Sequence, residues 1–314
     1  MNVHALYSTS TMMRILGMIF AGLFGLVFGS FLNVCLSRWP EGESVVQPRS
    51  HCRHCDHTLA WWENIPLLSW LILRGRCRGC RSWIGWRYPL VEFSVGILWA
   101  SIAWRLLEFS LDPDLPAISL FLHFNLYNEL GAAIGKAIFY WLLVALAVLD
   151  SENLWLPDWL TYPGIILGFV MNTVYRVIES RYTDDLSLSM KMEAERSAVG
   201  SILAILAAAA LILLIRWVYW LVRRREGVGL GDAKLMALLA AWLGLPGALL
   251  AFGLGVVFGA LIAVTLLALP AARREGQSWA LSKLPLGSFL CFGGIVSSLW
   301  GQPILAAYLR WAGF

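Results

Sequence analysis

The sequence is short of charge. Only 14% of its 314 residues are Asp, Glu, Lys or Arg, and 59% are hydrophobic, whereas a soluble domain carries about 25% charged residues. A soluble fold of this length could not cover so much apolar surface with so few polar side chains. The scarcity of charge therefore excludes a cytosolic enzyme, a secreted disulfide-bonded domain and a disordered chain, and it predicts a polytopic integral membrane protein.

Several motifs of soluble enzymes are also missing. The sequence has no Ser/His/Asp or H-E-x-x-H motif, and the glycines at 227, 229 and 231 lack the spacing and the preceding strand of a nucleotide-binding loop. No small-residue cleavage site follows the first apolar run, so we expect that run to be a membrane span and not a signal peptide. The net charge of +4 is too small to indicate a nucleic-acid partner, and none is expected.

Long apolar runs are what the sequence has in abundance. A helix needs about 20 apolar residues to cross a ~30 Å hydrocarbon core. We expect eight membrane helices, over residues 14–36, 89–107, 132–149, 159–175, 198–221, 233–246, 247–269 and 286–309. The sixth run is short and is broken from the seventh by Gly244, Pro246 and Gly247, which predicts a reversal of the chain. The predicted fold class is all-α, a transmembrane bundle of about eight helices with a four-cysteine loop over residues 37–88.

Lys and Arg are distributed unevenly between the predicted loops. The 37–88 segment contains eight arginines and four acidic residues, whereas residues 108–131 contain four acidic residues and no Lys or Arg. Further basic clusters occur at residues 223–225 and 273–283. Because loops rich in Lys and Arg stay in the cytoplasm, we expect the N-terminus outside, all three basic segments in the cytoplasm and the mixed 176–196 segment outside.

Four of the six cysteines form two C-x-x-C pairs in the polar loop, while Cys35 and Cys291 stand alone in apolar runs and are expected to be hydrophobic fillers. The paired cysteines, separated by 21 residues, are Cys52, Cys55, Cys77 and Cys80. This spacing is typical of four thiolates around one structural zinc ion. A redox dithiol and unligated thiols remain alternatives, although a redox pair needs no matched second copy. The nearby His51, His54 and His57 are expected to be loop residues, one of which could replace a cysteine ligand.

Three aspartates lie at the ends of predicted membrane helices, where acidic residues are costly. Asp150 ends the third run, Asp158 follows Pro157 at the start of the fourth, and Asp232 opens the sixth. Asp158 and Asp232 could each be a helix N-cap, but the helix dipole disfavours a carboxylate at the C-terminal position of Asp150. A paired Asp150 and Asp232 could share one proton, so that one activates water while the other protonates the reacting carbonyl group. This is the chemistry of aspartic proteases.

The motifs taken together resemble those of the type IV prepilin peptidases over nearly the whole chain. The resemblance is carried by Gly29-Ser-Phe-Leu-Asn33, Arg38-Trp-Pro40, Cys52-Arg-His-Cys55, Trp62-Glu63-Asn64-Ile65-Pro66, Arg74-Gly-Arg-Cys77-Arg-Gly-Cys80, Arg87-Tyr-Pro-Leu-Val-Glu92, Leu156-Pro157-Asp158, Gly229-Leu-Gly231-Asp232-Ala-Lys234 and Leu284-Pro-Leu-Gly287-Ser-Phe289. Two departures are modest. Asp150 and Asp232 lie 82 positions apart because the external loop is long, and no aromatic residue precedes Asp150.

The resemblance implies a function for these motifs. Asp150 and Asp232 would be the catalytic pair, supported by Asp158, Gly229, Gly231 and Lys234. The enzyme would remove the basic leader from prepilins and pseudopilins at the cytoplasmic face of the bacterial inner membrane. It would then methylate the new N-terminus with S-adenosyl-L-methionine, an activity associated with the zinc-type loop.

Two domains are expected on this basis. Residues 1–110, with the cysteine loop, would belong to methyl transfer, and residues 132–314 would form the membrane peptidase. Glu63, Arg87 and Glu92 are candidates for the methyl-donor site, and acidic residues of the loop could attract the basic leader. A peptidase without methyl transfer, a non-catalytic zinc-loop scaffold and a solute transporter using intramembrane carboxylates remain alternatives.

Overall fold

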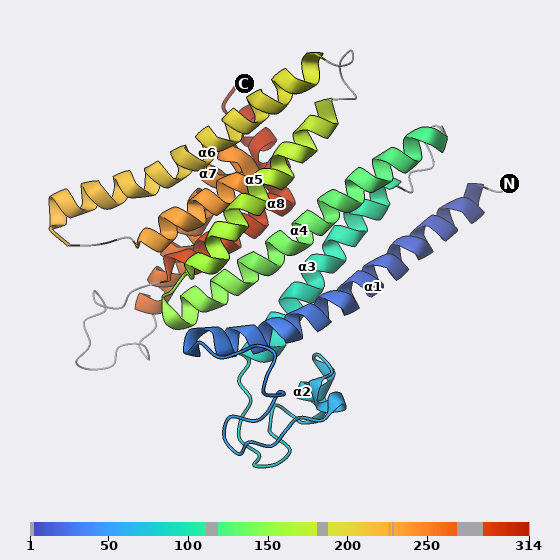
Figure 1. Cartoon of the computed structure of the whole chain (residues 1–314), viewed down its shortest axis with the longest axis vertical. Coiled ribbons are helices and arrows are strands. Elements are labelled where there is room, and N and C mark those ends of the chain that lie inside the picture. Colours follow the sequence, from blue (N-terminus) through green and yellow to red (C-terminus); the bar gives the residue numbers. More distant parts are fainter. Residues whose placement is uncertain are drawn as a thin grey trace. The chain divides into compact units, whose positions relative to one another are not determined.

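The structure is a computed structural model that describes residues 3–110, 119–180, 188–225, 227, 229–268 and 285–313. Within these residues the fold is helical and has no strand, only the isolated bridges His51–Thr58 and Arg76–Trp83 (Figure 1). Among the described residues, six helices are long and apolar enough to cross a membrane. The predicted all-α membrane fold with a four-cysteine loop is therefore confirmed. The basic segment at 273–283 lies outside the described residues.

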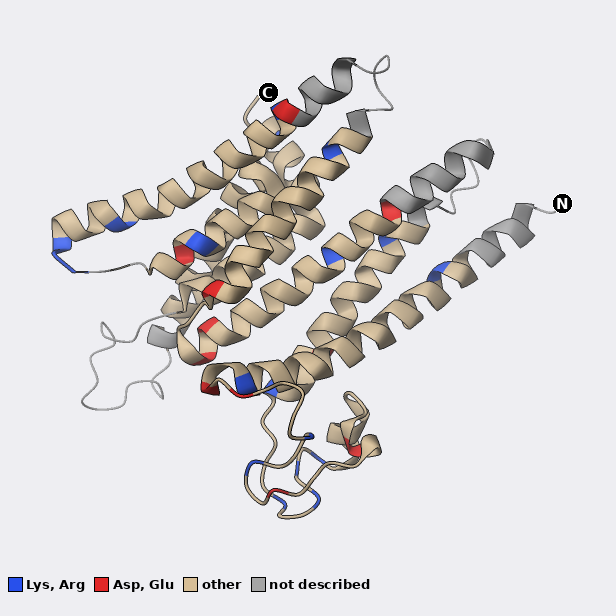
Figure 2. Ribbon diagram, in the orientation of Figure 1, with Lys and Arg blue, Asp and Glu red and all other residues tan. Residues whose placement is uncertain are grey.

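The chain divides into two compact units, Met1–Ala145 and Leu146–Phe314, and each is described by itself. The first contains α1 (Val3–Arg38), α3 (Arg87–Ser110) and most of α4 (Ser119–Asn153). The loop between α1 and α3 contains two 3₁₀ turns, η1 (Trp39–Glu41) and η2 (Trp61–Asn64), and a short helix, α2 (Leu68–Ile72). Figure 2 shows that most charged residues of this unit gather in the loop and that the helices carry few.

Glycines allow α1 and α3 to pack closely as an antiparallel pair. A Cβ atom added at Gly25 would lie 2.9 Å from the carbonyl oxygen of Val95, and one at Gly29 would lie 2.7 Å from the Cα atom of Glu92. Small residues at such contacts let two backbones approach where lipid supplies no hydrophobic driving force. The pairing brings Asn33, near the end of α1, to the start of α3, where its amide donates to the carbonyl oxygen of Tyr88 (2.9 Å).

The second unit contains the end of α4 and the helices α5 (Asp158–Ser180), α6 (Leu188–Arg223), α7 (Leu230–Ala268) and α8 (Leu286–Trp311). α7 packs against α5, α6 and α8. Its residues from Leu235 to Ala241 are buried, and they form the centre of this unit's core. α5 carries several polar side chains and is not among the six helices that meet the criteria for a membrane span.

α7 reverses direction at Gly244, as the sequence predicted. Gly244 has φ 70° and ψ 175°, a conformation that interrupts the helix and that residues with a side chain rarely adopt. Before this point α7 runs parallel to α5, because Lys234 meets Asp158 and Trp242 donates to the carbonyl oxygen of Gly164.

Beyond Gly244, α7 runs antiparallel to α8. The hydroxyl of Ser297 donates to the carbonyl oxygen of Gly247 (2.8 Å), and Gly255 lies against Phe289 near the start of α8. A Cβ atom at Gly293 would lie 2.2 Å from the carbonyl oxygen of Ala251, so the two helices touch through their backbones. The predicted sixth and seventh runs therefore form a helical hairpin within one continuous element.

Candidate active site and metal centre

Asp150 is buried at the end of α4, with 6% of its surface exposed. Its Oδ2 atom accepts two hydrogen bonds from Ser288 in the first turn of α8, one from the backbone N–H (2.7 Å) and one from the hydroxyl (3.1 Å). The N-terminus of a helix presents unpaired N–H groups and a positive dipole end, both of which suit a carboxylate. α8 therefore compensates for the unfavourable position of Asp150 at the C-terminal end of its own helix.

Asp232 is buried in the first turn of α7, with 8% of its surface exposed. Its Oδ2 atom accepts a hydrogen bond from the backbone N–H of Gly229 (3.0 Å), in the turn that precedes the helix. Gly231 passes close to Leu156, where an added Cβ atom would lie 3.1 Å from the leucine Cδ1 atom. Gly229 and Gly231, both predicted to support the site, thus let the chain pass close to the residues before α5 and orient Asp232.

The two aspartates lie close enough for their charges to interact, and both also lie close to the fully buried thiol of Cys291. The second unit therefore brings together Asp150 and Asp232, which are 82 positions apart in the sequence. Two buried carboxylates in one another's field are the arrangement that lets a pair hold one proton between them.

Asp158 and Lys234 form a separate ion pair. The ammonium group of Lys234 donates to Oδ1 of Asp158 and lies 5.4 Å from the ring centre of Tyr162. The Asp158 side chain is 58% exposed, in contrast to the buried Asp150 and Asp232. Both residues were predicted to support the site, but the sequence did not indicate that they contact one another across 76 positions.

Sequence reasoning assigned no role to Gly287 and Ser288, although it noted the segment that contains them. Ser288 supplies two donors to Asp150, and its hydroxyl also donates to the carbonyl oxygen of Ala147 (2.8 Å). A Cβ atom at Gly287 would lie 2.8 Å from the carboxyl carbon of Asp150. The sequence signal for these two residues was that they are a small-residue pair directly after Pro285 and Leu286, at the start of a predicted helix. Nothing in the sequence indicated that they contact Asp150.

The four loop cysteines converge in the first unit. Their sulfur atoms all lie within 4.8 Å of one another, with 3.8 Å between those of Cys52 and Cys80 and 3.9 Å between those of Cys55 and Cys77. Four sulfurs bonded to one zinc ion at about 2.3 Å are about 3.8 Å apart. The donor set and its spacing therefore fit a closed tetrahedral zinc site.

The two C-x-x-C turns have the same backbone geometry. In the first turn, the N–H of Cys52 donates to the carbonyl oxygen of His57, and the carbonyl oxygen of Cys52 accepts from the N–H of Asp56. In the second turn, Cys77 makes the same two bonds with Ser82 and Arg81. Asp56 and Arg81, each directly after the second cysteine, both have positive φ values (53° and 57°). Such matched turns aim both sulfurs of each pair to one side.

Hydrogen bonding favours the thiolate form of Cys80. The Ser82 hydroxyl lies 3.1 Å from the Cys80 sulfur, and this contact, together with the Ser82 backbone, lowers the pKa of Cys80 to about 6. A thiolate is the form that binds a metal ion. The three nearby histidines provide no ligand atom to the cluster among the described residues.

The three candidate methyl-donor residues lie around this loop but have different surroundings. Glu63 is buried, and its Oε2 atom accepts from the Ala60 N–H (2.7 Å) and contacts the ring of His57 (3.3 Å). Glu92 is buried and accepts from the N–H of Leu67 (2.8 Å). Arg87 donates to the hydroxyl of Ser37 (2.6 Å). The first two line a cavity that Arg87 does not line.

The fold and the two sites define a polytopic membrane protein with a pair of buried aspartates and a four-cysteine centre. The chain belongs to the type IV leader peptidase family. The profile of that family matches residues 137–264, and the profile of the bacterial peptidase A24 N-terminal domain matches residues 23–106. The protein is therefore a membrane peptidase, as the sequence predicted.

Curated relatives match most of the chain. The chain is 32% identical to a prepilin leader peptidase/N-methyltransferase of Stutzerimonas stutzeri over 92% of both chains. It is 31% identical to one of Pseudomonas aeruginosa over 93% of both. A third, from Myxococcus xanthus, is 37% identical over 78% of this chain and 62% of its own length. No solved structure matches the chain.

Proposed function

We propose that the protein removes the basic leader of type IV prepilins and pseudopilins with Asp150 and Asp232, and then methylates the new N-terminus with S-adenosyl-L-methionine. The names of the relatives, prepilin leader peptidase/N-methyltransferase, supply the two activities. The observation that carries the residue assignment is the mutual proximity of two buried aspartates, each held by backbone N–H donors at a helix start.

The mechanism follows from what each carboxyl group can do. The ionised aspartate takes a proton from a water molecule, whose oxygen attacks the scissile carbonyl carbon. The protonated aspartate donates to the carbonyl oxygen and so stabilises the tetrahedral intermediate. Collapse of the intermediate breaks the C–N bond: the leaving nitrogen takes the proton that the first aspartate removed from water, and the second aspartate regains its proton from the hydroxyl that becomes the new carboxyl group.

We further propose that Cys52, Cys55, Cys77 and Cys80 hold one structural zinc ion. A bound zinc ion would cross-link the loop. It would have no open coordination position, because the four protein ligands complete a tetrahedron. The loop is short of secondary structure and depends on such a cross-link for its shape.

The proposed location is the bacterial inner membrane, with the N-terminus in the periplasm and the cysteine loop in the cytoplasm. The eight arginines of residues 37–88 support this orientation. A prepilin held by its apolar N-terminal helix would then present its basic leader in the cytoplasm, on the side where the enzyme cleaves it. The proposed division into residues 1–110 and 132–314 assigns methyl transfer to the first and peptide cleavage to the second.

The test is to incubate the purified protein with a prepilin and S-adenosyl-L-methionine and to measure the mass of the product's N-terminus. Loss of the leader with a gain of one methyl group supports both activities. A cleaved and unmethylated product favours the alternative of a peptidase alone. An intact prepilin with folded, zinc-loaded protein favours a scaffold and contradicts the proposal.

Ser288→Ala is expected to slow leader cleavage about tenfold, because the charged Asp150 carboxylate loses the hydroxyl that donates a hydrogen bond to it. The backbone N–H of residue 288 remains, so cleavage is not abolished. The rate is measured on purified protein with a saturating prepilin. Ser297→Ala, in the same helix but bonded to the Gly247 carbonyl, is the matched control and keeps the wild-type rate. Equal rates for both variants would contradict a positioning role for Ser288.

Cleavage and methylation are expected to be separable. Asp232→Asn protein given an already cleaved, unmethylated pilin still transfers the methyl group, because the candidate donor residues Glu63, Arg87 and Glu92 belong to the first unit and the aspartates to the second. The measurement is incorporation of labelled methyl groups into the pre-cleaved pilin. If Asp232→Asn protein inserts normally and does not methylate that substrate, the two activities share one site.

A further inference from the structure

The short helix α2 presents an apolar face that nothing in the described part of the chain covers. Leu68, Leu71 and Ile72 are spaced three and four residues apart, so their side chains share one face of the helix. They are 55%, 62% and 74% exposed. A helix on the surface of a soluble domain turns such a face toward the core. A contiguous exposed apolar face marks an interaction surface, whereas single exposed apolar residues do not.

A hydrogen bond fixes the position of α2 along the membrane helices. The N–H of Leu67, directly before α2, donates to Oε2 of Glu92 (2.8 Å). Glu92 is buried, and it follows the start of α3 by five residues, inside the candidate membrane span Arg87–Leu107. At 1.5 Å per residue this is about 7 Å into the helix. α2 therefore begins alongside a membrane span, on the side of the loop that lies nearer to α1 and α3 (Figure 1).

A strained turn sets the direction of α2. Leu67 has φ 60° and ψ −47°, and the N–H of Leu68 donates to the carbonyl oxygen of Pro66 (2.6 Å). This is a γ-turn with positive φ, which is rare and unfavourable for a residue with a side chain. Strained backbone persists where the surrounding structure holds it, and here the bond to Glu92 does so. The turn and the bond together hold α2 in one orientation to α3.

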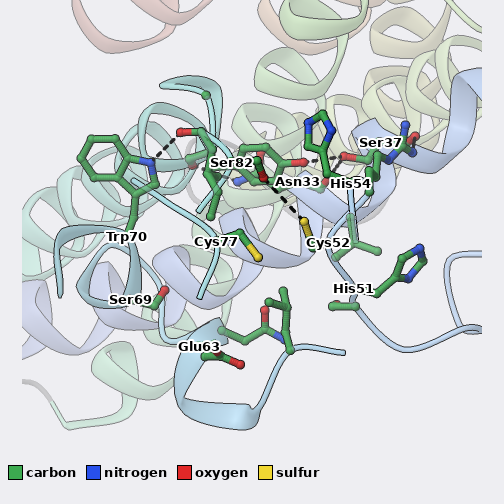
Figure 3. A pocket seen from close by; sticks show the side chains of 18 of the residues that line it. Asn33, Ser37, His51, Cys52, His54, Glu63, Ser69, Trp70, Cys77 and Ser82 are labelled. Carbon is green, nitrogen blue, oxygen red and sulfur yellow. Dashed lines mark hydrogen bonds between the residues drawn. The ribbon is translucent and has the colours of Figure 1, made fainter. Parts of the chain in front are cut away.

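Two exposed tryptophans adjoin α2. Trp83 and Trp86 are 52% and 60% exposed, and their ring centres lie 5.8 and 4.5 Å from that of Trp70 in α2. The indole N–H of Trp70 donates to the carbonyl oxygen of Ile84 (3.1 Å), which fixes the cluster (Figure 3). Trp86 directly precedes α3. Tryptophan at the end of a membrane span is typical of the membrane–water interface.

Exposed arginines lie close to these apolar residues in the sequence. Arg74 and Arg76 follow α2 by two and four residues, Arg81 precedes the tryptophans, and all three are exposed. Within the described ranges none of the three forms an ion pair, whereas Arg53 of the same loop pairs with Glu41. Guanidinium groups next to an apolar face match the two layers of a membrane surface, the phosphate groups and the acyl chains below them.

We propose that the α2 surface, defined as Leu68, Leu71, Ile72, Trp83 and Trp86, inserts into the interface of the membrane that α3 crosses. Its side chains lie among the upper acyl chains, and the three arginines contact the phosphate groups of anionic lipids. The partner is the lipid of the same bilayer, because α2 is held beside a membrane span and is flanked by cations. The inference rests on contacts within the first unit and not on the proposed peptidase or methyltransferase function. The four-cysteine loop is then held at the membrane surface by α2 as well as by α1 and α3.

The test is to place a photo-crosslinking residue on this surface. Ile72→benzoylphenylalanine is made in the full-length, zinc-loaded protein, which is reconstituted in vesicles of phosphatidylethanolamine and phosphatidylglycerol and irradiated. Mass spectrometry then identifies what covers position 72, and a phospholipid adduct is expected. Val46→benzoylphenylalanine is the matched control, because Val46 is an aliphatic residue of the same loop with 78% exposure and lies outside the α2 surface. It is expected to give about tenfold less lipid adduct.

Ile97→benzoylphenylalanine, at an exposed position within the α3 span, is the positive control for lipid labelling. Retained zinc and retained leader cleavage show that each variant is folded. An adduct of position 72 with a second copy of the chain or with added prepilin contradicts the proposal. Equal lipid labelling at positions 72 and 46 also contradicts it, as does an unlabelled position 72 when position 97 is labelled.

The arginines are tested by changing the lipid charge. In vesicles of phosphatidylcholine alone, lipid labelling at position 72 is expected to fall about fivefold, because the anionic headgroups are missing. Combined Arg74→Gln, Arg76→Gln and Arg81→Gln substitutions are expected to remove this difference between the two vesicle types. Arg49→Gln, which replaces another exposed arginine of the loop, is expected to keep it. Equal labelling in both vesicle types with all arginines present would contradict the contact with anionic lipids.

Discussion

Asp150→Asn and Asp232→Asn are each expected to reduce leader cleavage by about 10²–10⁴-fold, the contribution of a positioned general acid or base. Asparagine has nearly the size of aspartate and can still accept from Ser288 or Gly229, so the helix ends should keep their structure. It cannot take a proton from water or carry one to the substrate. The measurement is the rate of prepilin cleavage by purified protein whose zinc content and insertion match the wild type.

Asp158→Asn is the matched control for these variants. It removes one charge from the same unit, but Asp158 is largely exposed and paired with Lys234. Such exposed ion pairs contribute about 1 kcal/mol or less, so cleavage should weaken only slightly. An Asp158→Asn protein as inactive as Asp150→Asn would show that the catalytic pair is wrongly assigned.

Cys52→Ser is expected to remove the zinc, make residues 37–88 sensitive to protease and abolish methyl transfer, while leader cleavage continues. In small zinc domains, metal binding supplies on the order of 10 kcal/mol of folding free energy, and this loop has little other structure to replace it. The measurements are metal analysis, limited proteolysis and the two activity assays on the same preparation. Removal of zinc from the wild type by a chelator should have the same effects.

Cys35→Ala is the control for the cysteine substitution. Cys35 is buried in α1 and belongs to no cysteine cluster, so its replacement should leave one zinc per chain and an intact loop. Freshly prepared wild-type protein that contains no zinc would contradict the metal assignment, whatever the behaviour of the variants.

The sequence was sufficient wherever the determinant is local. Apolar runs gave the helices, Gly244 and Pro246 gave the reversal within α7, and C-x-x-C spacing gave the metal cluster. These features depend on a few neighbouring residues with strong preferences. The position of Asp150 at a helix end was also visible, because a carboxylate there is unfavourable unless something distant compensates for it.

The features of the site that the sequence did not predict depend on contacts between distant segments. Ser288 meets Asp150 across 138 positions, and no local pattern in residues 284–289 specifies that partner. Asn33 was part of a recognised motif, but its unpartnered oxygen becomes evident only when α1, α3 and the loop enclose a cavity. Arg87 was expected with Glu63 and Glu92 in the donor site, and that remains a prediction, with its observed contact made to Ser37.

The reversal at Gly244 also determines where α8 begins relative to the start of α7. Between Asp232 and Ser288 the helices of the second unit pass outward once and return once, so the first turns of α7 and α8 lie at the same end of that unit. A straight α7 would make a single pass, and α8 would then begin at the opposite end, where Ser288 could not reach Asp150. One residue without a side chain thus decides at which end of the second unit α8 begins.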